Sequence, residues 1–132
     1  MNPPSFLMSS LLVVVGGGIG AWLRFAIGRL VGSIMFPYAT LTVNILGSFA
    51  MGLLVGWLAR QGGPGSFDSE GWRLLLGVGV LGGFTTFSAF SLEFVALIER
   101  GALAQAALYV AASLVLGFAG LFAGLSLMRA AA

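Results

Sequence analysis

The chain of 132 residues contains no cysteine, no histidine and no lysine. It therefore has no disulfide, no thiolate or imidazole metal ligand, and no catalytic arrangement built on a histidine base. These absences exclude most classes of enzyme. Charge is also scarce, because 8% of the residues are charged, whereas roughly 25% is usual for a soluble domain. The six arginines are scattered singly, so the net charge of +2 indicates no nucleic-acid surface.

Apolar residues make up 59% of the chain and fall in four long runs without charge, at residues 1–23, 30–59, 74–92 and 101–128. About 20 apolar residues cross the hydrocarbon of a bilayer as a helix, so each run is long enough to span it. We predict a single all-α integral membrane domain over residues 1–132. Its four transmembrane helices are expected at about 5–28, 40–60, 72–98 and 102–128.

Turn-forming residues set two of these helix starts. Pro37 precedes the second helix, which is expected to begin near Thr40. The segment from Gln61 to Gly71 is rich in glycine and polar residues, and we interpret it as a loop. The third helix is therefore expected to begin near Trp72.

The arginines do not decide which way up the chain inserts. With four crossings, one end of the bundle carries Arg60, Arg73 and Arg129, and the other carries Arg24, Arg29 and Arg100. The positive-inside rule needs an excess of arginine on one side, and here the counts are equal. Insertion in both orientations is therefore allowed, and with it an antiparallel homodimer. If Arg24 lies inside its helix, a weak bias remains.

Small residues form ridges along two of the predicted helices. Most of the 21 glycines lie inside apolar runs, where each costs up to about 1 kcal/mol of helix propensity relative to alanine. The ridges, with a spacing of four, are Thr40, Asn44, Ser48, Gly52 and Gly56 in the second helix, and Gly16, Gly20, Arg24 and Gly28 in the first. Such ridges are typical of close helix packing in lipid. Arginine within the bilayer costs about 3 kcal/mol, so Arg24 either anchors a helix end at the headgroups or has a functional partner.

The third helix carries an unusual interruption at residues 82–91, GGFTTFSAFS. Adjacent glycines followed by β-branched threonines weaken a helix at a depth where lipid offers no replacement hydrogen bonds. We predict a break near mid-membrane that lines something polar, and freed carbonyls there can coordinate a cation. Beyond the break, Phe87 and Phe90 share a helix face. They either fill space or face lipid, or they turn their positive ring edges toward an anion.

Three segments resemble the Fluc family of fluoride channels, also called CrcB. They are GGGIGAWLRF at residues 16–25, TLTVNILGSFAMG at 40–52 and GGFTTFSAFS at 82–91. The resemblance covers nearly the whole chain. It implies a fluoride-specific channel that passively exports fluoride from the cytoplasm and lowers its toxicity, as a multi-pass protein of the bacterial inner membrane. It also implies an antiparallel, dual-topology homodimer with two pores and a structural sodium ion at its interface.

The same resemblance implies roles for single residues. The backbone carbonyls of Gly82 and Thr85 would hold the sodium ion together with their counterparts in the second subunit. The positions that match the fluoride pore are Phe87, Phe90, Asn44, Ser88, Thr40, Tyr109 and Ser113. Arg24 matches an arginine near the vestibule, and Glu93 matches a carboxylate near the anion route. Both are candidates for the vestibule or for gating.

The chain departs from the family pattern at two positions. Ala89 stands where many members have threonine, and Gly117, four residues beyond Ser113, supplies no hydroxyl to extend a polar track on the fourth helix. The sequence argues against three other functions. A small dual-topology exporter of drugs or cations needs an acid in its first helix, which residues 1–23 lack. A structural subunit would explain the glycine ridges but not the interruption, and an intramembrane enzyme would have only Glu93, Asn44 and hydroxyls.

Overall fold

The computed structural model describes residues 4–32, 34–61 and 67–131, and these are helical or form short connections, with no strand among them. The elements are α1 (Phe6–Val31), α2 (Tyr38–Leu58), α3 (Phe67–Trp72), η1 (Arg73–Leu81), α4 (Gly82–Phe84), α5 (Phe87–Glu99) and α6 (Leu103–Ala130). Four stretches are long and apolar enough to cross a membrane: Phe6–Val31, Tyr38–Leu58, Ser69–Glu99 and Leu103–Ala130. The predicted all-α class with four spans is confirmed.

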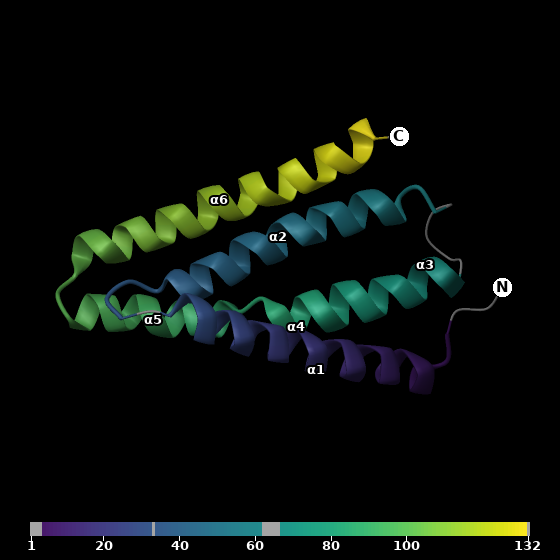
Figure 1. Cartoon of the computed structure of the whole chain (residues 1–132), viewed down its shortest axis with the longest axis horizontal. Coiled ribbons are helices and arrows are strands. Elements are labelled where there is room, and N and C mark those ends of the chain that lie inside the picture. The colour runs from purple at the N-terminus through teal and green to yellow at the C-terminus, as the bar shows by residue number, and fades with distance from the viewer. Residues whose placement is uncertain (1–3, 33, 62–66, 132) are drawn as a thin grey trace.

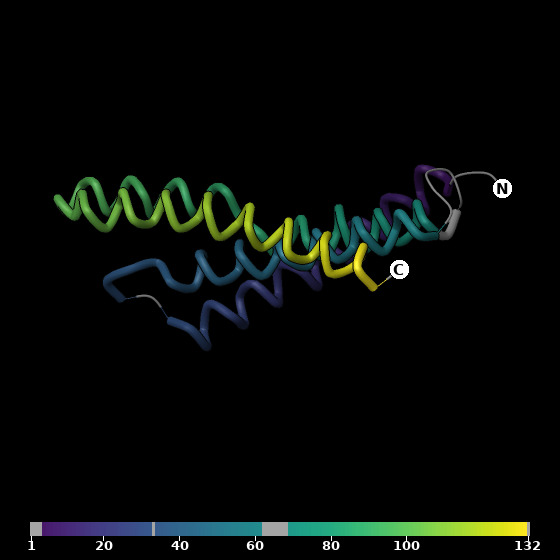
Figure 2. The backbone as a smooth tube through the Cα atoms, turned by 90° about the horizontal axis from the view of Figure 1, so that it is seen from above, coloured from purple at the N-terminus to yellow at the C-terminus, as the bar shows by residue number. Residues whose placement is uncertain are grey.

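The four spans run alongside one another, and both termini lie at the same end of the molecule (Figure 1). Viewed from above, α5 and the first half of α6 diverge from the end of α1 and the start of α2 (Figure 2). The closest helix pairs are α2 with α6 and α1 with η1. In Figure 1 the spans instead fan apart toward the end where α1 begins and α6 ends, so the helices separate in a different direction at each end of the bundle.

Several helix boundaries differ from the predicted ones. The first helix continues to Val31, where Gly32 adopts a φ of 66° and ends it. The second begins at Tyr38, directly after Pro37. The third begins at Phe67, inside the segment interpreted as a loop. There Arg73 donates hydrogen bonds of 2.8 and 2.7 Å to the Glu70 carboxylate one turn earlier, and this pair supports the additional turn.

Glycines bring the helix backbones into direct contact. A Cβ on Gly20 of α1 would overlap the carbonyl oxygen of Val80 in η1, and one on Gly52 of α2 would overlap that of Leu121 in α6. The ridges predicted from the spacing of small residues are thus packing surfaces at these positions. Gly28 is different, because no described atom lies within 4 Å of a Cβ placed there.

The first part of the third span is a π-helix, which the sequence did not predict. It covers Arg73–Leu81, and the N–H of Gly82 that follows donates to the carbonyl of Gly77, five residues earlier. Such wide turns are rare and frequently occur at functional sites. Here the π-helix leads directly into the interruption of the third span.

Helical geometry stops at Thr85 and Thr86 and resumes at Phe87. Thr85 has φ −76° and ψ 159°, and Thr86 has φ −153° and ψ 118°, so both residues are extended. The predicted break of the third helix is confirmed and lies between α4 and α5.

Candidate functional site

The break redirects two backbone N–H groups to side chains. In a continuous helix Thr86 would donate to the carbonyl of Gly82, and Ala89 to the carbonyl of Thr85. Instead, Thr86 donates to Asn44 Oδ1 at 2.8 Å and Ala89 donates to Thr86 Oγ1 at 3.2 Å. The two carbonyls that lose these donors belong to Gly82 and Thr85, the residues expected to bind a cation.

Asn44 on α2 braces the break from the side. In addition to accepting from Thr86, it donates from Nδ2 to the Thr86 carbonyl at 3.0 Å. A carboxamide carries two N–H bonds, so one remains for another acceptor. The family resemblance predicts that Asn44 donates hydrogen bonds in a pore, but its partner in the structure lies 42 residues away and could not be predicted.

Three other predicted residues meet in one polar cluster between α2, α5 and α6. Thr40 donates to Glu93 Oε1 at 2.8 Å, and the Tyr109 hydroxyl donates to Glu93 Oε2 at 2.7 Å. Tyr109 is fully buried. In the part of the chain that the structure describes, the only ion pair joins Glu70 and Arg73, so hydroxyls rather than cations hold the Glu93 carboxylate.

Aromatic rings connect this cluster with the break. The ring centroids of Phe90 and Tyr109 are 5.0 Å apart, and those of Phe87 and Phe90 are 5.7 Å apart. Glu93, Phe90 and Phe87 follow one another at intervals of three residues, so they share one face of α5. Phe87 is 79% exposed in the single chain. The two predicted rings therefore lie between the Glu93 carboxylate and the extended residues of the break.

A cavity opens at each end of this row. The cavity beside the break has a volume of about 320 Å³ and is lined by Asn44, Gly47, Ser48, Met51, Thr85, Thr86, Phe87 and Leu121. The other, also about 320 Å³, is lined by residues 34–37 together with Glu93, Ala96, Leu97 and Arg100. Both cavities are partly polar, which a span in contact with lipid alone would not need.

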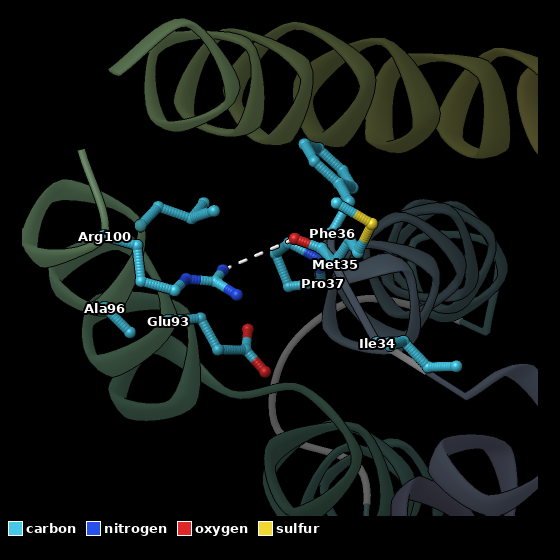
Figure 3. Close-up of a pocket in the computed structure, with 8 residues that line it drawn as sticks. Ile34, Met35, Phe36, Pro37, Glu93, Ala96 and Arg100 are labelled. Carbon is cyan, nitrogen blue, oxygen red and sulfur yellow. Dashed lines mark hydrogen bonds between the residues drawn. The ribbon is translucent and has the colours of Figure 1, made fainter. Parts of the chain in front are cut away.

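Figure 3 shows the second cavity, between α5 and the connection from α1 to α2. The Arg100 side chain reaches across it and donates to the Met35 carbonyl at 3.4 Å, and the Glu93 carboxylate faces the same space. Glu93 thus belongs to both the cavity and the buried cluster. The sequence did not indicate Arg100 as a site residue, because Arg100 stands in a short charged connection with no motif around it.

The remaining predicted residues lie at different distances from this row. Arg24 is well inside α1, not at its end, and its Nη1 lies 3.5 Å from the Thr85 carbonyl. Ser88 is exposed, with its hydroxyl 3.4 Å from that of Thr86. The Ser113 hydroxyl on α6 is buried and has no hydrogen-bond partner among the described residues. Arg24 and Ser88 therefore belong to the surroundings of the break, whereas Ser113 is separate from the Glu93 cluster.

Comparison with known proteins gives consistent matches. Residues 11–125 match the family described as CrcB-like protein, Camphor Resistance (CrcB). A protein of Novosphingobium aromaticivorans named fluoride-specific ion channel FluC is 54% identical over 131 residues, which cover 96% of this chain and 100% of that protein. Proteins of the same name from Caulobacter sp. (strain K31) and Rhodopseudomonas palustris (strain BisB5) are each 52% identical, over 90% and 93% of this chain and 93% and 98% of their own lengths.

Proposed function

This chain belongs to the CrcB-like protein family, and we propose that it acts as its FluC relatives are named, as a fluoride-specific ion channel. It is a multi-pass bacterial membrane protein whose task is ion transport. Passive movement of fluoride out of the cytoplasm, which lowers its toxicity, is the physiological role we infer. The structural observation that supports this function is the row of Glu93, Phe90 and Phe87 on one face of α5, with a partly polar cavity at each end.

The pore has to replace the water that fluoride loses, because moving an unpaired ion out of water is very costly. Thr40 and Tyr109 donate to Glu93 in this structure, and so we assign the direct replacement of water to other donors. The free N–H of Asn44 and the exposed hydroxyl of Ser88 are the candidates. The positive ring edges of Phe87 and Phe90 can face the anion without burying a second charge. Larger halides would be excluded by the width of this path.

We also infer an antiparallel homodimer in which the break of one chain faces that of the other. Gly82 supports this arrangement, because it is exposed and a Cβ placed on it would have only the Gly77 carbonyl within 4 Å, at 3.7 Å. No neighbour in the described part of the chain requires glycine there. Because Gly82 has no side chain, a second chain could approach its backbone closely at this position.

The carbonyls of Gly82 and Thr85 fit a structural sodium ion at that interface. Both have lost the N–H donor of a continuous helix, and carbonyl oxygens are hard ligands suited to a hard cation. The same two carbonyls of the second subunit would complete the site. The ion would supply positive charge between the two breaks. In the single chain Arg24 approaches the Thr85 carbonyl, so this guanidinium would have to share that oxygen or move aside.

A flux assay with the purified protein tests the function. Liposomes loaded with potassium fluoride and containing the protein are expected to release fluoride when valinomycin is added, as measured with a fluoride electrode. Liposomes loaded with potassium chloride are expected to retain chloride, and liposomes without protein to retain both. Failure to release fluoride, or equal release of both halides, would overturn the proposal.

A further inference from the structure

Gly117 on α6 faces a hydroxyl group of α2. A Cβ placed on Gly117 would have a single described neighbour within 4 Å outside its own helix backbone, the Ser48 hydroxyl oxygen at 3.7 Å. The position therefore has room for a side chain. At this level of the seam between α2 and α6, the hydroxyl comes from α2.

The Ser48 hydroxyl is free to bind an ion. Serines within helices commonly donate to the carbonyl four residues earlier, and Ser10 and Ser91 do so here, to Phe6 and Phe87, at 2.8 and 2.9 Å. Ser48 makes no such bond in the described part of the chain. A serine whose hydroxyl is not tied to its own helix can turn its O–H toward a ligand.

Ser48 also lies on the cavity beside the break. It follows Asn44 by one helical turn, so the hydroxyl and the carboxamide share one face of α2. The same cavity is lined by Thr85, Thr86 and Phe87. Across the seam on α6, one turn before Gly117, the buried hydroxyl of Ser113 has no partner among the described residues. Two uncommitted hydroxyls thus lie along the seam near the amide of Asn44.

We propose that Ser48 is an ion-coordinating residue of this channel, which supplies from α2 the hydroxyl that Gly117 does not supply from α6. The proposal rests on the proposed function, since its ligand is the permeating fluoride. A small anion stripped of water needs several donors along its path. Because residue 117 is glycine, loss of the Ser48 hydroxyl leaves no hydroxyl donor where Ser48 faces Gly117.

The proposal is tested by exchanging the hydroxyl between the two helices. Ser48→Ala is expected to lower the initial rate of fluoride release by about tenfold, because a hydrogen bond to a charged group is lost. Adding Gly117→Ser in the same chain is expected to restore most of that rate, since the new side chain starts beside the vacated position. Ser10→Ala removes a hydroxyl that is bonded within α1 and is expected to leave the rate unchanged.

The outcomes distinguish a failure of the proposed role of Ser48 from a failure of the proposed channel function. A Ser48→Ala channel that conducts at the wild-type rate would overturn the role of Ser48, while the wild-type flux would still establish the channel. A loss that Gly117→Ser does not restore would mean that Ser48 acts through packing, which also overturns it. Size-exclusion elution of every variant shows whether the assembly remains intact. Absence of flux from the wild type would instead refute the function itself.

Discussion

The carboxamide of Asn44 and the backbone of Thr86 exchange two hydrogen bonds, of 3.0 and 2.8 Å, between the second span and the break of the third. Asn44 thereby satisfies the Thr86 N–H, which the interrupted helix leaves without a partner, and adds a second hydrogen bond to the Thr86 carbonyl, the first acceptor of α5. A backbone N–H without a hydrogen-bond partner in lipid costs roughly several kcal/mol of free energy. The break is therefore held open by a specific neighbour.

Replacing Asn44 by aspartate tests whether this side chain faces the anion path. Asn44→Asp keeps an acceptor for the Thr86 N–H but loses the donor to the Thr86 carbonyl, and it places a negative charge beside the anion path. We expect fluoride release to fall to the level of liposomes without protein, with unchanged size-exclusion elution. Unaltered flux in a folded variant would show that Asn44 only braces the break.

The rings of Phe87 and Phe90 are expected to be needed for flux. Phe87→Ile and Phe90→Ile keep an apolar side chain but remove the polarised ring edge, so each is expected to slow fluoride release by about tenfold or more. Phe118 on α6 is a matched control, because its ring is 65% exposed and lines neither the cavity beside the break nor the one beside Glu93. Phe118→Ile is expected to conduct normally. Normal rates in both test variants would remove the rings from the mechanism.

Local sequence features were sufficient to predict the spans and the break. Hydropathy located four membrane crossings, and the glycine and threonine pairs at residues 82–86 predicted the interruption, because both depend on groups that are adjacent in the chain. The predicted start of the third helix, near Trp72, was wrong, because the glycine-rich and polar composition of residues 61–71 favours a loop, whereas the helix begins at Phe67. The π-helix had no local signal. It lies against α1, where Gly16 and Gly20 allow the backbones to touch.

The partners within the site could not be predicted, because they come from different spans. Thr40, Glu93 and Tyr109 were each singled out by family resemblance, yet their shared hydrogen bonds depend on how α2, α5 and α6 pack. The same holds for Asn44 and Thr86. A four-residue spacing shows that polar residues share a face, but it does not show what that face contacts.

The buried cluster around Glu93 offers a further test. Tyr109→Phe removes one hydroxyl from the carboxylate and leaves the ring in contact with Phe90. Loss of a hydrogen bond between spans is expected to lower the free energy of unfolding by about 1 kcal/mol. Chemical unfolding in detergent measures this change. Tyr38→Phe, at a residue that is 59% exposed, is the control and is expected to be neutral. Equal stability of all three proteins would contradict the importance of the cluster.

The glycine contacts predict opposite outcomes for two positions on the same helix. Gly20→Ala is expected to destabilise the protein by about 1–3 kcal/mol, because the added methyl group would overlap the Val80 carbonyl of η1. Gly28→Ala meets no described atom within 4 Å and is expected to be neutral or to stabilise α1 by up to about 1 kcal/mol. The unfolding midpoints of both variants in detergent provide the comparison. Similar midpoints would mean that backbone contact between α1 and η1 is not required.

Dual insertion predicts that each end of the chain is accessible from both sides of the membrane. Both termini lie at one end of the bundle (Figure 1), so a single tag at the C-terminus reports the orientation of the whole chain. We expect about half of the tags to be protected in inside-out vesicles, since the arginines are balanced. Labelling from one side alone would show that one orientation is imposed.

Shifting the arginine balance tests whether function needs both orientations. Arg60→Gln with Arg129→Gln, and separately Arg29→Gln, remove charge from opposite ends, and all three side chains are exposed. Each variant is expected to insert in one orientation, which leaves it without an antiparallel partner. Fluoride flux from either one alone should then fall to background, and co-expression of the two should restore it, because oppositely oriented chains can pair again. Full flux from one variant that labelling shows to be uniformly oriented would rule out the antiparallel assembly.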